Sequence, residues 1–593
     1  MSASTALRVA APLRRARVRA AALLASACAF CSMPATADIE IVIPDVSAAV
    51  ENNVRTFLSL TRYADRDDVD VETMARLQRR IVNETREALQ PLGYYEPDVS
   101  WRTEQNGSSW RVTIHIIPGR PVRLSQVEID ASGPGADHRP LRELLQAQVL
   151  KPGLRLNHGA YERVKSDLLR TARNEGYLDA RFTRNELIID RAERQANVHL
   201  HLDTGPRYSF GEISIAQDAI DEAPMRRMLR MRRGDPYTLD ALLRTQYVLD
   251  DSLYFDNVAI ESGELDRESL TVPVSITADP ARKHRFATSL GYGTDTRVRG
   301  RFTWNNRRVN HAGHRFSMQL LGSSVVKELS ARYAIPVMDV ALEKLEFTAS
   351  LSEEEFGDAL SQRAQIGAGL TQTMGRWQRV LFLRALNETS TVGAEPSQTD
   401  FLLIPGISYS SLPSYVVGGR ARPYFLYAEL RGSPSTLGSD SSFLQIRAQG
   451  ERIFDLGPLW TLRLRAEIGA SRVADFSRLP VSQRFFAGGE RSVRGFALNE
   501  LSPKDETGAS IGGENLAAGS IELTRALPRN FGVAAFYDIG NAFDSFADPQ
   551  FEYSVGLGVR YNVAVASFGV DVAQALSESG RSPRVHLFIS TQF

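Results

Sequence analysis

The sequence contains very little cysteine and has no long apolar run beyond its N-terminus. Among 593 residues there are two cysteines, Cys28 and Cys31, and both lie in the N-terminal segment discussed below. The rest of the chain therefore offers no disulfide, thiolate metal site or cysteine nucleophile. No later run of about 18 or more apolar residues occurs, which argues against a helical membrane protein. Membrane β-strands hide their apolar residues in alternation, so a barrel is not excluded.

The motifs of common enzyme classes are also missing. The sequence has no P-loop, no G-x-S-x-G elbow and no H-E-x-x-H pair, and its nine histidines show no metal-ligand spacing. We therefore expect no enzymatic activity, no cofactor and no metal. Lysine plus arginine and aspartate plus glutamate number 70 each, so nothing indicates a nucleic-acid partner.

Residues 1–37 have the pattern of a secretory signal peptide. Five arginines precede a short apolar core at 20–30, and the sequence Ala-Thr-Ala ends at Ala37, before Asp38. This core is too short to span a bilayer. We expect cleavage between Ala37 and Asp38, followed by export of the remaining chain.

Residues 38–281 mix helical and strand-like segments in a loose internal repeat. Each unit combines a helical stretch, a corner containing a tyrosine, and strands that end at a turn. The corner tyrosines Tyr94, Tyr177 and Tyr254 are 83 and 77 residues apart. A period of this length indicates a string of small α+β domains. The predicted domains are 38–119, 120–206 and 207–281.

From residue 282 onward the sequence changes to strands and turns. In 553–561, large apolar residues alternate with Ser, Gly and Arg. In a soluble sandwich the apolar face would form the core, whereas in a membrane barrel it would face lipid and the polar face would line a wet lumen. The export signal, the strand lengths and the aromatic C-terminus favour the barrel. At about 20 residues per strand, 282–593 predicts about 16 antiparallel strands. The final strand carries Val585, Leu587, Ile589, Thr591 and Phe593 on one face.

Two short motifs lie near the end of this barrel region. They are Val493-Arg494-Gly495-Phe496 and Phe536-Tyr537-Asp538-Ile539-Gly540. Both resemble the signature motifs of barrels of the Omp85 superfamily. The resemblance implies that the first motif belongs to an extracellular loop folded into the lumen, and that Asp538 and Gly540 lie on the barrel wall. It implies that Arg494 pairs with Asp538, because a guanidinium in a partly closed lumen needs a charged, bidentate partner. Gly495 would allow a tight turn, and Phe496 would pack against the inner wall.

The arrangement of three corner-bearing units before a barrel resembles POTRA (polypeptide-transport-associated) domains of this superfamily. The number of units resembles its TamA-type branch, the outer-membrane subunits of the translocation and assembly module. This resemblance implies a Gram-negative outer membrane, with the soluble domains in the periplasm. It also implies contact with outer-membrane lipid, a TamB-like partner anchored in the inner membrane, and unfolded outer-membrane or autotransporter proteins as clients.

The first predicted barrel strand is rich in small residues. Gly291 and Gly293 lie on one face of 286–293, and glycine weakens strand packing. We expect the seam between this strand and the last one, 585–593, to be the weak joint. A client strand would pair with the opened edge, so that the protein inserts or secretes client proteins. A passive outer-membrane channel, a two-partner-secretion-type transporter and a soluble adhesin of sandwich domains remain alternatives.

Overall fold

The computed structural model describes residues 39–591, except 65, 67–68, 107–108, 148, 394, 413–423 and 564–565. The predicted signal peptide, its cleavage site at Ala37 and Asp38, and the terminal Phe593 lie outside the described residues. No helix within the described residues is long and apolar enough to cross a membrane. The chain divides into two compact units. One contains the residues up to Ser209 with two short segments, 236–239 and 267–270, and the other contains the rest.

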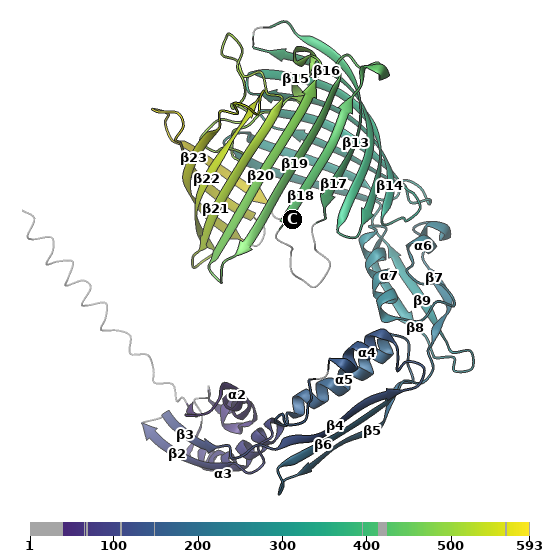
Figure 1. The fold of residues 1–593 in the computed structure, drawn as a ribbon, viewed down its shortest axis with the longest axis vertical. Helices are drawn as coiled ribbons and strands as arrows, with labels where there is room; N and C mark the ends of the chain where they lie inside the picture. Colours follow the sequence, from purple (N-terminus) through teal and green to yellow (C-terminus); the bar gives the residue numbers. More distant parts are fainter. Residues whose placement is uncertain are drawn as a thin grey trace, which may run out of the picture. The chain divides into compact units, whose positions relative to one another are not determined.

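The first of three small sheets is formed by the first elements of the described chain (Figure 1). Its elements are β1 (Ile39–Val42), α2 (Ala48–Phe57), α3 (Val71–Leu89), β2 (Asp98–Asn106) and β3 (Ser109–Ile117). β3 lies in the middle, parallel to β1 and antiparallel to β2. Helix α3 begins at Asp70, whose carboxylate accepts a hydrogen bond of 2.8 Å from the Thr73 N–H. Apolar residues at helical spacing then form its buried face, on which Ile81 is fully buried in one core with Ile114 of β3.

The second and third sheets repeat this order of elements. The second contains β4 (Arg123–Ser132), α4 (Arg139–Gln146), α5 (His158–Asn174), β5 (Arg181–Asp190) and β6 (Gln195–Asp203). The third contains β7 (Ser209–Ala216), α6 (Glu222–Met228), α7 (Leu239–Asp251), β8 (Phe255–Ser262) and β9 (Thr271–Pro280). In both sheets the last strand along the chain lies between the other two. The three sheets therefore share one topology.

Each predicted corner tyrosine follows a residue with left-handed backbone. The φ angle is +87° at Gly93, +93° at Gly176 and +65° at Leu253. Glycine adopts this conformation readily, whereas a residue with a Cβ loses roughly 1–2 kcal/mol there. The first two corners therefore contain glycine, which adopts this conformation without strain, whereas the third corner makes the same turn with a strained leucine backbone.

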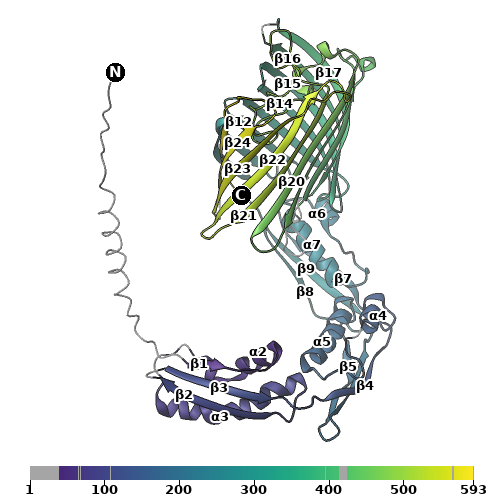
Figure 2. The same cartoon turned by 60° about the vertical axis from the view of Figure 1, so that its left-hand side comes forward.

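Sixteen strands of the described chain form one closed barrel, each antiparallel to its neighbours. Its strands are β10 (His284–Gly293), β11 (Arg297–Asn306), β12 (Arg315–Gly322), β13 (Val326–Pro336), β14 (Glu343–Phe356), β15 (Ala359–Met374), β16 (Trp377–Val392), β17 (Gln398–Ser411), β18 (Tyr424–Ser433), β19 (Phe443–Asp455), β20 (Trp460–Val473), β21 (Asn515–Ala526), β22 (Phe531–Phe543), β23 (Glu552–Val563), β24 (Ala566–Ala575) and β25 (Arg584–Thr591). They run obliquely around the wall (Figures 1 and 2). The predicted architecture of about 16 antiparallel strands is confirmed.

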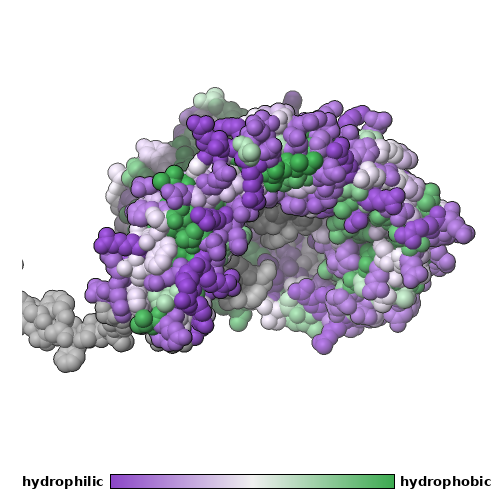
Figure 3. Space-filling model, turned by 90° about the horizontal axis from the view of Figure 1, so that it is seen from below, coloured by the Kyte–Doolittle hydropathy of each residue, from purple (hydrophilic) through white to green (hydrophobic). Residues whose placement is uncertain are grey.

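The barrel wall separates an apolar outer face from a polar inner face. On β23, Leu557 is 68% exposed on the outside, whereas Ser554 is fully buried on the inside. The apolar outer face of the wall differs from the surface seen from below, which is mostly hydrophilic (Figure 3). Closure of the sheet pairs the backbone groups that hydrocarbon would otherwise leave unsatisfied.

Candidate functional site

The longest connection of the barrel joins β20 to β21 and folds into the lumen. β10 starts at the barrel end next to the third sheet, so the turns that follow even-numbered strands lie at the opposite end, which the motif resemblance predicts to be extracellular. Residues 474–514 follow the even-numbered strand β20, so this connection starts and ends at that end of the barrel. They carry Val493, Arg494 and Phe496, whose side chains are all at least 95% buried. The loop of the first motif therefore lies inside the barrel.

Arg494 is held by side chains from three strands on one side of the wall, β21, β22 and β24. Its Nε and Nη2 donate to the two carboxylate oxygens of Asp538, both at 2.8 Å. Its Nη1 donates to Glu522 at 2.7 Å and to Asp571 at 3.2 Å, and Nη2 also reaches the Ser520 hydroxyl at 3.1 Å. The structure thus brings Arg494 and Asp538 together in a bidentate ion pair.

A second arginine offsets part of the negative charge of the three carboxylates in this cluster. Arg560 donates to Glu522 at 3.3 Å and forms a short hydrogen bond with Asp571. Burial works against the charge on Arg494, but hydrogen bonds and charges from Asp538 and Glu522 outweigh it and raise the pKa of this guanidinium. The Phe536 ring lies 3.3 Å from the same group. The arginine is therefore permanently charged and fixed in both position and orientation.

Gly495 and Phe496 seat the loop against the wall. A Cβ on Gly495 would lie 2.7 Å from Ser554 Cβ and 2.9 Å from Ala575 N, closer than real Cβ contacts. The Gly495 N–H donates to the Ser554 hydroxyl at 3.1 Å. Phe496 lies in an apolar cluster formed by the loop and the strands behind it. The other members are Phe485, Ala487, Val493, Leu501, Leu516, Ala542 and Ala575.

Gly540 has a different place from its motif neighbour Asp538. Both lie on β22, but a Cβ on Gly540 would lie 2.7 Å from Ala518 on β21. Gly540 therefore allows two wall strands to approach closely and is not part of the ion cluster.

The barrel seam joins β10 to β25 by very little backbone pairing. Within the described strands, β10 has one register pair with β25, Gly293 with Phe588, against ten pairs with β11. The Thr294 N–H donates to Leu587 O at 3.2 Å, and the Arg299 side chain reaches Ile589 O at 3.3 Å. β25 ends at Thr591.

The two seam glycines differ in their surroundings. A Cβ on Gly291 would lie 2.8 Å from the Arg299 Nε, whereas one on Gly293 would meet no atom closer than 3.3 Å. Gly291 is therefore tightly packed beneath a side chain of β11. Gly293, which forms the single pair across the seam, is less crowded, because an added Cβ would need the Thr296 side chain to move by only a few tenths of an ångström.

His586 on β25 connects the loop to the seam, and the sequence did not single it out. Its side chain is fully buried. Its Nε2 lies 2.7 Å from the Arg494 carbonyl oxygen, and its Nδ1 lies 3.4 Å from Thr294 Oγ1 and 3.7 Å from Asp295 Oδ1. The sequence pattern could have identified His586, because this residue alternates with the apolar positions 585 and 587 and therefore faces the lumen. The same pattern could have identified Glu522, Asp571 and Arg560, which are charged residues at polar positions of strands with alternating polar and apolar residues.

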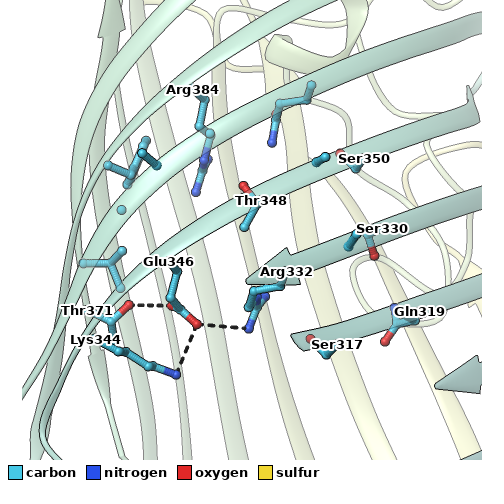
Figure 4. Close-up of a pocket in the computed structure, with 18 of the residues that line it drawn as sticks. Ser317, Gln319, Ser330, Arg332, Lys344, Glu346, Thr348, Ser350, Thr371 and Arg384 are labelled. Carbon is cyan, nitrogen blue, oxygen red and sulfur yellow. Dashed lines mark hydrogen bonds and ion pairs between the residues drawn. The ribbon is translucent and has the colours of Figure 1, made fainter. Parts of the chain in front are cut away.

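The lumen wall across from this cluster is polar. A cavity of about 640 Å³ there is lined mainly by hydroxyl, amide and charged side chains of β11–β17 (Figure 4). Glu346 accepts a hydrogen bond of 2.7 Å from Thr371, and ion pairs of 3.3 and 3.8 Å join it to Lys344 and Arg332. Such an interior is typical of a barrel that contains water.

Two families match the chain. Residues 282–593 match the Omp85 superfamily domain, and residues 40–118 match the POTRA domain described as TamA domain 1. The chain belongs to the Omp85 superfamily. This Omp85 protein is accordingly an outer-membrane barrel with POTRA domains in the periplasm, and the predictions of family and location are confirmed.

Relatives and solved structures agree with this assignment. The outer membrane protein assembly factor BamA of Nitratidesulfovibrio vulgaris is 24% identical over 355 residues, which cover 56% of this chain and 44% of that protein. BamA of Neisseria meningitidis serogroup B is 23% identical over 500 residues, covering 76% and 61%. The Omp85 chain thus spans about half the length of the curated relatives it matches. The crystal structure of BamA from Haemophilus ducreyi lacking POTRA domains 1–3 matches with a TM-score of 0.63 at 14% identity, covering 79% of this chain and 99% of that one. This last likeness shows the fold.

Proposed function

We propose that this Omp85 protein is an assembly or translocation factor that inserts or secretes client proteins by strand pairing at the β10–β25 seam. The observation that carries the proposal is the single register pair across that seam. Opening it breaks little backbone pairing, whereas opening any fully paired junction of the wall breaks many hydrogen bonds. The seam is therefore the place where the barrel opens at the lowest free-energy cost.

An opened seam is a template for an incoming strand. Separation frees the one register pair and gives access to the edge groups of β10 and β25 that have no register partner across the seam, and hydrocarbon contains no water to satisfy them. A client β-strand supplies those partners by pairing with the exposed edge. The client strand and the closed seam therefore use the same backbone groups, so that client binding competes with closure of the barrel.

The two sides of the seam differ in their main attachments, although the lumenal loop also reaches the β10 side, where the Glu490 N–H donates to the Asp295 carboxylate at 2.7 Å. The β25 side is tied to the lumenal loop through His586 and the Arg494 carbonyl. The strands that follow β10 are tied to the third sheet. Arg230 forms an ion pair with Asp339 at 2.9 Å in the β13–β14 turn. The Tyr254 hydroxyl donates to Gly313 O at 2.6 Å in the β11–β12 turn.

The periplasmic domains dock a TamB-like partner, and autotransporter-like proteins are among the clients. The match of residues 40–118 to a TamA-type POTRA domain supports this branch of the superfamily, as does the presence of three similar sheets. Each sheet has two edge strands, which are β1 and β2, β4 and β5, and β7 and β8. A partner segment would extend one of these sheets by β-augmentation.

A disulfide across the seam tests the proposal. Cysteines at Gly293 and Phe588 occupy the one register pair, in a chain that has no other cysteine once residues 1–37 are removed. The matched control pairs Ala331 with Ala349, which face each other on β13 and β14. We expect oxidation of the seam pair to stop client insertion into proteoliposomes and reductant to restore it, with no effect on the control. Undiminished insertion by the locked barrel would refute the proposal.

Conductance in planar bilayers separates this proposal from a passive channel. Arg494 and its loop lie inside the lumen, so we expect a small, flickering conductance. A large steady pore that persists in the seam-locked protein would favour the channel instead.

A further inference from the structure

The strand ladder of the barrel is interrupted between β17 and β18, at the extracellular end of the wall. β17 has 14 residues, but five of them pair with β18, from Gly406 opposite Arg431 to Ser410 opposite Tyr427. β18 ends at Ser433. The first eight residues of β17, up to Pro405, therefore have no register partner on β18 in the described strands.

This interruption is a built feature of the wall. The Phe401 N–H donates to the Asp440 carboxylate at 2.7 Å, and the Leu403 N–H donates to the Ser439 hydroxyl at 2.9 Å. Pro405, the next residue facing the gap, has no N–H to satisfy. The backbone donors that β18 would have paired are thus satisfied by other means, and the gap is stable without a strand.

An apolar groove of about 990 Å³ lies on the outer wall at this interruption. Its apolar lining comes from Leu381, Pro405, Ile407, Leu430 and Leu444. The first of these pairs with Ile407, which pairs with Leu430, so these residues share the lipid-facing side of the sheet. Hydrocarbon chains of the surrounding leaflet are therefore in direct contact with the groove.

Arg472 lies at the extracellular rim of the groove. It is the penultimate residue of β20 and faces Leu444 across the β19–β20 ladder, so its side chain points outward. It is exposed, and within the described part of the chain it makes no hydrogen bond or ion pair. Lys327, another outward-facing cation at this end of the wall, is paired with Glu353 at 2.6 Å. Arg472 thus offers an uncompensated guanidinium beside an apolar groove.

We propose that this groove binds a phosphate-bearing lipid of the outer leaflet, with an acyl chain along the groove and the phosphate at Arg472. The apolar lining matches the chain, and a guanidinium binds phosphate with paired, charge-assisted hydrogen bonds. An outward arginine is costly at the bilayer midplane but is tolerated near the interface, where headgroup phosphates lie. The site lies on the wall between β16 and β20, away from the β10–β25 seam, and does not depend on the proposed seam mechanism.

Native mass spectrometry of the full chain tests this site. The protein is purified in detergent and mixed with a doubly phosphorylated glycolipid (lipid A), its dephosphorylated form or phosphatidylcholine. We expect preferential retention of the phosphorylated lipid, and Arg472→Gln to lower that retention about tenfold, as for loss of a charge-assisted hydrogen bond. Arg525→Gln is the matched control, because Arg525 is an exposed arginine near the periplasmic end that stacks on Trp460.

A second variant tests the groove separately from the charge. Leu430→Trp fills part of the groove with a larger apolar side chain on the lipid-facing wall, where it does not disturb the lumen. We expect weaker retention with Arg472 still present, and circular dichroism confirms that each variant is folded. Equal retention of phosphorylated and dephosphorylated lipid, or an equal loss in the Arg525 control, would overturn the site.

Discussion

The barrel seam and the joints between the periplasmic domains are closed in opposite ways. At the first joint, the Val122 N–H donates to Gly93 O at 2.8 Å, and the Leu156 N–H donates to Val122 O at 2.9 Å. The second joint repeats this pattern among Gly176, Tyr208 and Tyr237, at 2.8 and 3.0 Å. The joints are therefore held by backbone hydrogen bonds.

The seam relies mainly on side chains, whereas the joints rely on backbone. Besides its single register pair and the Thr294 N–H to Leu587 O bond, β25 is held by His586, which reaches the Arg494 carbonyl and Thr294, and by Arg299 from β11. Side-chain contacts can be released one at a time, whereas a backbone ladder opens cooperatively. The comparison supports the proposal that the seam opens, whereas each of these joints contains local backbone hydrogen bonds.

Removal of the central cation of the cluster is expected to have the largest effect. Arg494→Ala leaves Asp538, Glu522 and Asp571 buried with one remaining guanidinium, and loss of one partner of a buried ion pair costs about 3–5 kcal/mol. We expect the free energy of unfolding in detergent, measured by urea titration, to fall by that order. The control is Arg491→Ala, an exposed arginine in the same loop. Similar losses in the two variants would show that the cluster does not hold the loop.

Part of this ion cluster could be predicted from the sequence. The motif resemblance implied that Arg494 meets Asp538, because the two residues occupy signature positions. It did not imply Glu522 or Asp571, since residues on different strands come together through the register, which alternation alone does not determine. Inspection of charged residues at lumenal positions would have given candidates but not the partners.

The fold followed from sequence more readily than the irregular parts of the wall did. Alternation over nine or more residues predicted the barrel strands, and the tyrosine spacing predicted repeated domains. The gap beside Pro405 was not predicted, because it depends on Asp440 and Ser439 of a distant loop satisfying β17. Similarly, the left-handed corner at Leu253 contains no glycine, the residue that would have indicated such a conformation in the sequence.

A substitution at the second joint is expected to have an intermediate effect. Gly176→Ala places a Cβ 2.4 Å from the Tyr237 carbonyl oxygen at a φ of +93°, and the forced backbone shift should cost about 2–3 kcal/mol in total. Gly234→Ala is the matched control, since it has a φ of +88° with nothing within 4 Å of the added Cβ. The difference between their thermal unfolding temperatures measures the joint alone. Equal temperatures would mean that close backbone approach does not stabilise the joint.

Loss of the His586 contact at the seam is expected to have the smallest effect on the free energy of unfolding of the whole protein. Its effect should be confined to the opening of the β10–β25 seam. His586→Ala removes the contact with the Arg494 carbonyl, which costs about 1–2 kcal/mol for a buried, unsatisfied acceptor. That is a factor of roughly 5–30 in the opening equilibrium. Hydrogen exchange should therefore accelerate in β25 and leave β14 and β15, with 14 register pairs between them, unchanged. His311→Ala, an exposed histidine in the β11–β12 turn, is the control. Acceleration spread evenly over all strands would contradict side-chain closure, because a local tie can bias only the junction that it spans.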